Sequence, residues 1–319
     1  MYDNLDLRLS KDECEGIDLL EEVPQFLTCV KVQGLNNSGP FIVGYLDRLR
    51  ITITDNNVKI NQSSLCKYYH GNNFKTLTRE DTEMAIKQIS EALHLPFDHA
   101  IVTRIDFAEN MSMENDEKLY YPYLGVSQYY DRLEQNNGLY FVNNKRQLIF
   151  YGKVNEQKDK KNPIPDEYKN HNLLRFEMRL LKNPSKQLNQ PQITAGMLYD
   201  KKFYHELVLR WYNEYRAIQK ISTRLTNLKP TGSTKSLIES LATFSILDIG
   251  QPAVLATIKE WSKTSQITRK QASDHRAIIK KLASNQPEMK NNELVQELDH
   301  KVRDAMKFHL SESLTVSLN

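Results

Sequence analysis

Three segments in the middle of the chain carry charged or phenolic side chains two residues apart. They are Arg104 and Asp106 in the first segment, Tyr151 and Lys153 in the second, and Arg175, Glu177 and Arg179 in the third. Because successive side chains of a β-strand point to opposite faces, residues two apart lie on the same face. If the three segments are neighbouring strands, their polar residues share one electropositive surface and their apolar residues fill the other face.

This combination of residues suits phosphoryl transfer at a DNA phosphodiester. Asp106 and Glu177 are hard oxygen donors that suit Mg²⁺ or Mn²⁺, and such a metal would polarise the scissile phosphate. Tyr151 would attack the phosphorus atom, which leaves a covalent phosphotyrosine and a free 3′-hydroxyl. A tyrosine has an ordinary pKa of about 10, so it needs activation, for which Lys153 is the candidate. The phosphate oxygens would be held by arginines, namely Arg104, Arg175 and Arg179.

Other interpretations of the same residues stay open. Each polar face could be an ordinary solvated sheet face, and Tyr151 could be a packing residue, since the chain has 16 tyrosines. Some of the tyrosines could instead stack on unpaired bases beside the basic surface.

The segments that carry the candidate residues are predicted to be β-strands. The expected central strands cover residues 101–108, 138–142, 147–154 and 173–181. A hairpin loop is expected at 143–146, and a charged surface loop at 157–172.

The flanking parts of the chain also give local signals. Alternating apolar and polar residues predict a strand over 2–9, and a similar pattern predicts a β-hairpin over 41–60. Residues 78–81 form a capping box that opens a helix, which ends before Pro96. From Lys201 the apolar spacing predicts one helix to about Leu228.

Residues 229–233 are the best linker in the chain, and amphipathic helices with a polar tail are expected after them. We therefore predict an α+β protein with an antiparallel-rich central sheet and flanking helices, followed by a small helical C-terminal region. The expected domains are residues 1–228, which carry the candidate chemistry, and residues 229–319.

Charge is unevenly distributed along the chain. The net charge is only +3, but residues 1–120 carry 12 basic and 20 acidic side chains, whereas residues 121–280 carry 26 basic and 14 acidic. A basic segment of this kind is typical of a surface that binds a polyanion. Lys201, Lys202 and Arg210 of the predicted helix are therefore further candidates for DNA binding, and phosphate contacts would make that binding salt-dependent.

Composition narrows the class of protein. A length of 319 residues and a mean hydropathy of −0.60 indicate a soluble globular chain of one or two domains. No apolar run approaches the ~18 residues of a membrane span, and the first residues lack the pattern of a signal peptide. The three cysteines form neither a disulfide framework nor a zinc pattern. We expect a cytoplasmic protein that has no membrane partner.

Taken in order, the three central motifs resemble those of the phage and plasmid rolling-circle replication initiators of the II/X family. They read VTRIDFA at 102–108, LIFYGKVNE at 148–156 and LLRFEMR at 173–179, and the resemblance covers about residues 1–225. It implies an enzyme that nicks one strand at a replication origin, stays attached through a tyrosine and rejoins the displaced circle. Tyr151 falls on the YxK position of the nucleophile, whereas Asp106 and Glu177 fall on the acidic positions of the flanking motifs.

The resemblance also implies partners and leaves two assignments open. The partners are origin DNA, double-stranded and single-stranded, and a host helicase. Many endonucleases of the wider class bind metal with a His-hydrophobic-His pair, but none of the eight histidines here forms one. The metal site would therefore be carboxylate-based or would recruit a distant histidine such as His70. Related plasmid initiators place the tyrosine after the RFE strand, so Tyr199 and Tyr204 stay open as nucleophiles.

Two other functions compete with a nicking enzyme. The protein could be a non-catalytic origin-binding or copy-control factor that holds DNA without cutting it. It could also be an unrelated hydrolase that uses the two carboxylates and has no affinity for DNA, although the basic segment 121–280 argues against this.

Overall fold

The computed structural model describes residues 1–34, 39–221, 233–284 and 292–311. Two compact units emerge: the first combines Met1–Lys220 with Glu297–Asn319, and the second is Ile221–Gln296. The candidate residues for chemistry all lie in the first unit, which is therefore described first.

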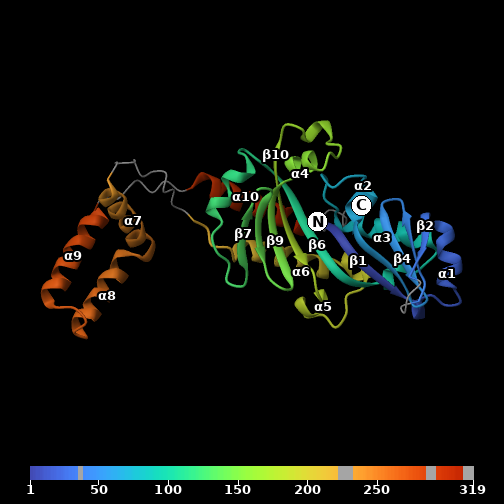
Figure 1. Ribbon diagram of the computed structural model, residues 1–319, viewed down its shortest axis with the longest axis horizontal. Coiled ribbons are helices and arrows are strands. Elements are labelled where there is room, and N and C mark those ends of the chain that lie inside the picture. The colour runs from blue at the N-terminus through green and yellow to red at the C-terminus, as the bar shows by residue number, and fades with distance from the viewer. Residues whose placement is uncertain (35–38, 222–232, 285–291, 312–319) are drawn as a thin grey trace. The chain divides into compact units, whose positions relative to one another are not determined.

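The first unit is built on an antiparallel sheet, which has ten strands in the described part of the chain (Figure 1). The strands lie in the order β2-β3-β4-β5-β1-β6-β10-β9-β8-β7. Their bounds are β1 Tyr2–Ser10, β2 Thr28–Gln33, β3 Phe41–Leu46, β4 Leu49–Thr54, β5 Asn57–Ser64, β6 Ile101–Met113, β7 Asp131–Gln135, β8 Gly138–Val142, β9 Arg146–Gly152 and β10 Asn172–Leu180. The strands that carry the polar motifs, β6, β10 and β9, are thus neighbours, which is the condition for a shared polar surface.

Helices connect and cover these strands. The α-helices of the first unit are α1 Leu19–Glu22, α2 Leu65–His70, α3 Arg79–Leu93, α4 Lys153–Asp159, α5 Pro184–Gln187, α6 Lys201–Arg216 and, from Glu297 onward, α10 Glu293–Ser311. Short 3₁₀ turns are η1 Lys11–Glu13, η2 Val23–Phe26, η3 Phe97–His99, η4 Glu117–Leu119, η5 Tyr121–Tyr123, η6 Asp166–Tyr168 and η7 Ala195–Tyr199. The α+β prediction with an antiparallel central sheet is confirmed.

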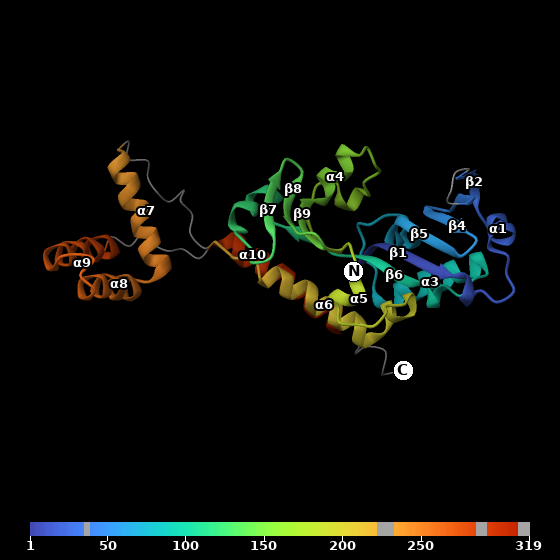
Figure 2. The ribbon, with the colours of Figure 1, turned by 60° about the horizontal axis from the view of Figure 1, so that its bottom comes forward.

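An aromatic core lies between α6 and the apolar face of the central strands. The ring of Phe176 stacks on Phe150 with centroids 4.4 Å apart, and the indole of Trp211 packs on Phe176 at 4.9 Å. The Trp211 Nε1–H also donates to the Phe176 carbonyl oxygen at 3.3 Å. Figure 2 shows α6 and α10 on the same side of the sheet. This packing leaves the opposite, polar face of β6, β10 and β9 for the functional site.

The predicted start of α3 is confirmed in detail. The Thr78 side chain accepts from the Asp81 amide, and the Asp81 carboxylate accepts from the Thr78 amide, both at 3.0 Å. These reciprocal bonds satisfy two backbone donors that the first helical turn leaves unpaired. The helix ends at Leu93, ahead of Pro96, with His94 in the left-handed conformation at φ 50°.

The predicted strand over 147–154 is wrong at its end. Strand β9 stops at Gly152, and Lys153 begins helix α4. Glu156 pairs with Lys153 three residues before it and with Lys160 four residues after it, and these spacings favour a helix. Helix α4 also replaces the first residues of the loop expected over 157–172.

The predicted helix from Lys201 to Leu228 is also shorter than expected. Helix α6 ends at Arg216, because the chain then pairs with an earlier loop. The Gly125 amide donates to the Gln219 carbonyl oxygen at 2.8 Å, and the Gln219 amide donates to Val126 at 2.9 Å. Residues 222–232, which include Leu228 and most of the predicted linker, lie outside the described residues.

The second unit contains the helices α7 Thr234–Ile249, α8 Gln251–Lys263 and α9 Arg269–Ser284. Gly250 separates α7 from α8 and has a φ of 90°, which is a conformation that favours glycine. Among the described helices, none alone is long and apolar enough to cross a membrane, and α7 with α8 passes such a test only as a bent pair, by length and composition.

The division into 1–228 and 229–319 differs from the two units, because the last helix returns to the sheet. From Glu297 onward, α10 belongs to the first unit. Tyr215 of α6 donates to Asp299 of α10 at 2.6 Å, and His309 of α10 lies 2.6 Å from the Glu109 carboxylate of β6. His309 is 4% exposed, so this pair is shielded from water. A local apolar pattern identifies such a helix but not the surface that it covers.

We predict that His309→Ala lowers the free energy of unfolding by about 3 kcal/mol, because the half-buried Glu109 carboxylate loses its imidazole partner and keeps only the hydrogen bonds from Thr76 and the Asn110 amide. Urea denaturation of the full chain, followed by tryptophan fluorescence, measures the effect. His300→Ala is the matched control, since the His300 side chain is 69% exposed and pairs with Asp304 on the same helix. Equal stabilities of the two variants would contradict the described position of α10.

Candidate functional site

The strand register brings the predicted polar residues onto one face. On β10, Arg175 lies opposite Tyr151 of β9 and Asn110 of β6, and Arg179 lies opposite Asp106 of β6. Residues paired across neighbouring strands share a face of the sheet. The motifs of three separate segments therefore meet side by side, which the sequence could only suppose.

Glu177 lies at the centre of this cluster. Its carboxylate accepts from Arg179 Nε at 2.8 Å and from the Tyr151 hydroxyl at 3.3 Å. The side chain is only 1% exposed. Glu177 therefore links the predicted nucleophile to a predicted phosphate ligand, and water has little access to either contact.

Asp106 adjoins the same arginine. It accepts from Arg104 through two hydrogen bonds of 2.8 and 2.7 Å, and Arg179 Nε lies 3.8 Å from its second oxygen. Burial raises the pKa of Asp106 to about 6, with Glu177 adding to the rise and Arg104 opposing it. Asp106, Glu177 and Tyr151 thus converge around Arg179, the condition under which they can act on one phosphate.

Arg175 is buried beneath this cluster rather than exposed to a ligand. Its guanidinium donates to the Asp3 carboxylate at 2.6 Å and to the Asn110 side chain at 3.0 Å. Burial alone would raise the pKa of Asp3. The Arg175 charge and the hydrogen bond from Ser64 outweigh this effect, so the pKa of Asp3 lies below its usual range. Asp3 and Asn110 were not among the predicted site residues. The strand pattern over 2–9 was the one sequence signal that placed Asp3 near a sheet face.

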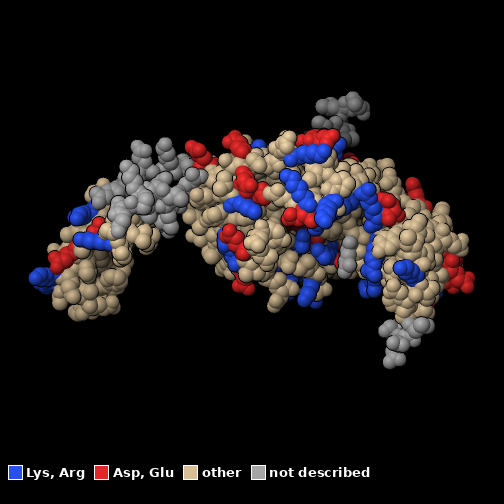
Figure 3. Space-filling view, turned by 45° about the horizontal axis from the view of Figure 1, so that its top comes forward, with Lys and Arg blue, Asp and Glu red and all other residues tan. Residues whose placement is uncertain are grey.

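The partially exposed arginines of the cluster are Arg104 and Arg179. Their side chains are 25% and 28% exposed, against 3% for Arg175. Lys and Arg side chains gather in the middle of the polar face of the sheet (Figure 3). Of the three arginines predicted to hold phosphate, Arg104 and Arg179 are therefore placed to meet a ligand, and Arg175 is placed to hold the strands together.

Tyr151 and Lys153 are close in space, although the reason differs from the predicted strand alternation. Lys153, the first residue of α4, has its Nζ atom 5.8 Å from the centroid of the Tyr151 ring and 2.9 Å from the Glu156 carboxylate. Burial raises the pKa of Tyr151 well above its ordinary value. Burial and the neighbouring Arg175 lower the pKa of Lys153 to about 8. Tyr151 is thus protonated near neutral pH, whereas Lys153 can lose its proton at a pH only slightly above neutral.

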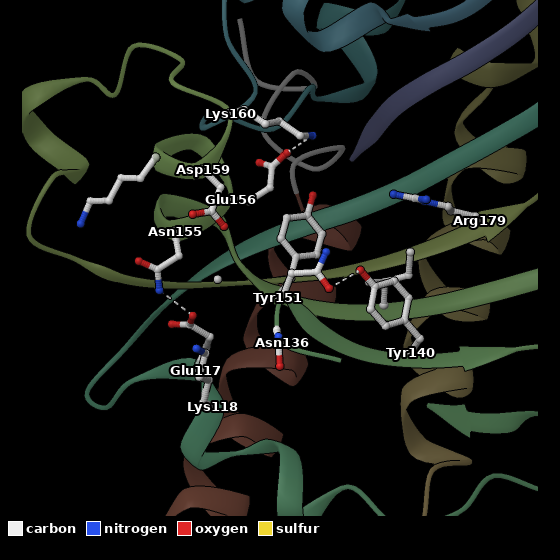
Figure 4. Close-up of a pocket in the computed structure, with 14 residues that line it drawn as sticks. Glu117, Lys118, Asn136, Tyr140, Tyr151, Asn155, Glu156, Asp159, Lys160 and Arg179 are labelled. Atoms are coloured by element: carbon white, nitrogen blue, oxygen red, sulfur yellow. Dashed lines mark hydrogen bonds and ion pairs between the residues drawn. The ribbon is translucent and has the colours of Figure 1, made fainter. Parts of the chain in front are cut away.

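A cavity of about 470 Å³ opens beside Tyr151. Figure 4 shows that Tyr140, Tyr151 and Arg179 line it together with side chains from η4 and α4. Those from η4 and α4 are Glu117, Lys118, Asn155, Glu156, Lys158, Asp159 and Lys160. The predicted nucleophile therefore faces a space that can hold a ligand.

The carboxylates do not form a metal centre in this arrangement. Arg104 and Arg179 occupy the oxygens of Asp106 and Glu177 that a cation would need. In the described residues, no group of three or more His, Cys, Asp and Glu side chains could hold a metal ion. His70 lies 3.4 Å from Asp81, whose position at the start of α3 is separate from the cluster. Binding of Mg²⁺ or Mn²⁺ at Asp106 and Glu177 stays a prediction that requires the arginines to move.

The remaining predicted residues lie elsewhere. Lys201 and Lys202 begin α6, which covers the apolar face of the sheet, and both are exposed. Arg210 donates to Glu214 on the same helix at 2.9 Å. These three residues therefore do not join the cluster around Tyr151, and their binding to DNA stays a prediction.

The two alternative nucleophiles are engaged in other contacts. Tyr199 donates to Asp98 at 2.6 Å, and burial with this bond raises the pKa of Tyr199. Tyr204 is 1% exposed and its hydroxyl lies 3.0 Å from His309 Nδ1. Of the three candidate tyrosines, Tyr151 is the one that lines the cavity together with Arg179.

Comparison with protein families gives a match. A family model that describes the N-terminal part of the phage replication-associated protein encoded by gene II matches residues 1–217. The matched region contains β1 to β10 and all of α6, and thus the whole cluster around Tyr151. No curated protein matches the chain.

We predict that Asp3→Asn lowers the free energy of unfolding by about 3 kcal/mol, because the buried Arg175 guanidinium loses its short ion pair and keeps only the 3.7 Å contact with Glu177. Urea denaturation of the full chain gives the value. Glu15→Gln removes an exposed acidic charge and is expected to leave stability within about 0.5 kcal/mol of the parent protein. A similarly small change for Asp3→Asn would show that this ion pair does not hold β1 to β10.

Proposed function

Because the chain belongs to this family of phage replication-associated proteins, we propose that it starts rolling-circle replication by nicking one DNA strand at an origin. The nick leaves the protein attached through a phosphotyrosine, and the protein later rejoins the displaced strand. One observation carries this proposal: Tyr151, on the YxK motif, lines a cavity with Arg179 and is bonded to Glu177.

In the proposed nicking step, the Tyr151 oxygen attacks the phosphorus atom of the scissile phosphodiester. The bond from this oxygen to phosphorus forms, and the bond from phosphorus to the 3′-oxygen breaks. The 3′-oxygen leaves with the electron pair and takes up a proton to become a 3′-hydroxyl. Rejoining is the reverse reaction, in which a 3′-hydroxyl attacks the phosphotyrosine and releases Tyr151.

Lys153 is the proposed acceptor of the tyrosine proton. Its pKa of about 8 makes a neutral amine accessible at the pH at which Tyr151 is still protonated. Proton transfer is most effective when the pKa of the base lies near the working pH. After the nick, the same ammonium group can return its proton to the leaving 3′-oxygen.

Arg179 and Arg104 are the proposed ligands of the non-bridging phosphate oxygens. Both are partly exposed, and both are held by buried carboxylates that fix the direction of the guanidinium group. Donors fixed in advance stabilise the charge that develops in the transition state without a further cost of reorganisation. The buried acids thus orient the two arginines, and binding of Mg²⁺ or Mn²⁺ at Asp106 and Glu177 remains part of the proposal.

Origin DNA is the proposed substrate, in double-stranded form for recognition and single-stranded form for cutting. Lysines exposed around the cavity, Lys118, Lys158 and Lys160, fit contacts with the phosphate backbone. Lys201, Lys202 and Arg210 of α6 would contact DNA on a different side of the sheet. A host helicase as partner and a cytoplasmic location complete the proposal.

We predict that Tyr151→Phe abolishes nicking and the covalent complex, because phenylalanine lacks the attacking oxygen. The assay incubates the full chain with supercoiled origin plasmid and Mg²⁺, and detects nicked circles and protein-linked DNA by gel. Tyr199→Phe is the matched control and is expected to retain both.

Other outcomes of this assay bear on the competing hypotheses. DNA that is shifted but never cut by the parent protein would contradict the enzyme and favour a non-catalytic origin-binding protein. Nicking that survives in Tyr151→Phe and is lost in Tyr199→Phe would assign the nucleophile to Tyr199 instead of Tyr151. Equal nicking in EDTA and in Mg²⁺ or Mn²⁺ would contradict the predicted metal.

We predict that the nicking rate rises with pH up to about 8 and is then constant, because Lys153 must lose its proton to act as a base. About two pH units below this value, the neutral form and the rate fall about 100-fold. Nicking rates between pH 6 and pH 9 measure the profile at constant salt.

Glu156→Gln tests the assignment of that inflection to Lys153. The Glu156 charge raises the pKa of Lys153, so its removal should shift the inflection to lower pH. Glu206→Gln makes the same chemical change at an exposed glutamate of α6, which lies outside the cavity, and should leave the inflection in place. An inflection that does not move in Glu156→Gln would exclude Lys153 as the titrating base.

A further inference from the structure

The cavity beside Tyr151 is larger than the attack of a tyrosine on one phosphate requires. Its volume of about 470 Å³ lies in the range of pockets that hold small ligands. Gly138 of β8 allows the β8 backbone to approach β9 closely beside Tyr151. A Cβ atom at Gly138 would lie 2.6 Å from the Phe150 carbonyl oxygen and 3.1 Å from the Tyr151 Cβ. No side chain from β8 can therefore stand at this position.

Tyr140 gives the cavity an aromatic wall. It lies on β8 opposite Ile149, and Ile149 and Tyr151 share one face of β9. The Tyr140 hydroxyl donates to Asn137 in the β7–β8 turn at 3.3 Å, which holds the ring at the cavity (Figure 4). Unpaired bases stack on such rings in proteins that bind single-stranded nucleic acid.

Glu117 gives the cavity an anionic wall that is nearly buried. The residue is 4% exposed, and Asn155 of α4 donates to its carboxylate at 2.7 Å. The Glu117 carboxylate lies in the space that a Cβ atom at Gly152, the last residue of β9, would occupy. The Glu117 carboxylate, which comes from η4, thus contacts both β9 and α4 at the cavity.

We propose that this cavity holds the unpaired nucleotide next to the scissile phosphate, and that Glu117 selects a base with an exocyclic amino group over thymine. The inference rests on the proposed nicking activity and adds its base specificity. A carboxylate accepts hydrogen bonds from the amino groups of cytosine, adenine or guanine. Thymine has no exocyclic amino group, and its N3–H donor lies between two carbonyl oxygens that would face the carboxylate and leave buried acceptors unpaired.

The charges around the cavity agree with a nucleotide as its occupant. Arg179 and Tyr151 lie where the scissile phosphate would be, and Lys118, Lys158 and Lys160 are exposed at the rim. The base would enter between Tyr140 and Glu117, and its neighbouring phosphates would meet the lysines. A small inorganic anion would gain nothing by stacking on the Tyr140 ring and would be repelled by the buried Glu117 carboxylate.

The test captures covalent complexes of the full chain with single-stranded oligonucleotides that contain the origin nick region and are randomised around the cut. Sequencing of the captured strands is expected to show thymine depleted about tenfold at one position flanking the nick. Glu117→Gln should abolish the depletion while capture persists, because an amide can donate to a thymine oxygen. Glu206→Gln, an exposed glutamate of α6, should retain it. Thymine captured as well as the other bases by the parent protein, or depletion unchanged in Glu117→Gln, would overturn the proposal.

Tyr140 provides an independent arm of the same experiment. Tyr140→Ala should reduce capture of every sequence about tenfold, and Tyr140→Phe should retain it, because stacking needs the ring rather than the hydroxyl. Tyr129→Ala is the matched control, since Tyr129 is 69% exposed and lies outside the cavity. Full capture by Tyr140→Ala would show that the base does not stack on the Tyr140 ring.

A binding measurement separates failure of the pocket from failure of the nicking activity. Fluorescence anisotropy of labelled oligocytidylate and oligothymidylate, with the full chain, requires no cleavage. Tighter binding of the cytosine oligomer, lost in Glu117→Gln and in Asn155→Ala, supports the pocket even if no covalent complex ever forms. Equal binding of the two oligomers by the parent protein overturns it, whether or not the protein nicks DNA.

Discussion

The buried ion pair between Arg175 and Asp3 is the interaction on which the rest of the site depends. It joins β10 to β1 across β6, and a guanidinium that is almost fully shielded from water is stable only with such a partner. A second Arg175 nitrogen donates to the Asn110 side chain. Arg175 is also the cross-strand partner of Tyr151. The buried Arg175 side chain thus fixes the position of Tyr151, the residue proposed to attack DNA.

The same burial separates the proton affinities of the two groups proposed for chemistry. Tyr151 and Lys153 are both shielded from water, and burial disfavours the charged form of each. For the tyrosine the charged form is the anion, so its pKa rises, whereas for the lysine it is the cation, so its pKa falls to about 8. One low-dielectric environment therefore yields a protonated nucleophile beside a base that can be neutral. The carboxylates of Asp106 and Glu177, each engaged by arginine, hold cations at the mouth of the site rather than supplying a proton acceptor.

The C-terminal part of the chain supports the sheet that carries this site. Helix α10 follows the second unit in sequence, yet it packs on the first through Tyr215, Tyr204 and Glu109. Tyr204 lies behind Phe107 of β6, on the face of the sheet opposite the cavity. The polar face is thus left to the ligand, and both α6 and α10 contribute to the apolar side that keeps the central strands in register.

The sequence by itself determined the elements whose stability is local. Alternation placed Asp106, Tyr151 and Glu177 on polar strand faces, and the Thr78 capping box located the start of α3, because strand pleat and helix capping act over a few residues. Only the tertiary structure decided which strands are neighbours, that Arg175 is buried against Asp3, and that Lys153 reaches Tyr151 from a helix after β9 ends. It also decided that α10 returns to the first unit. These contacts join residues far apart in the chain, and their energy comes from burial and charge pairing that no local pattern of residues records.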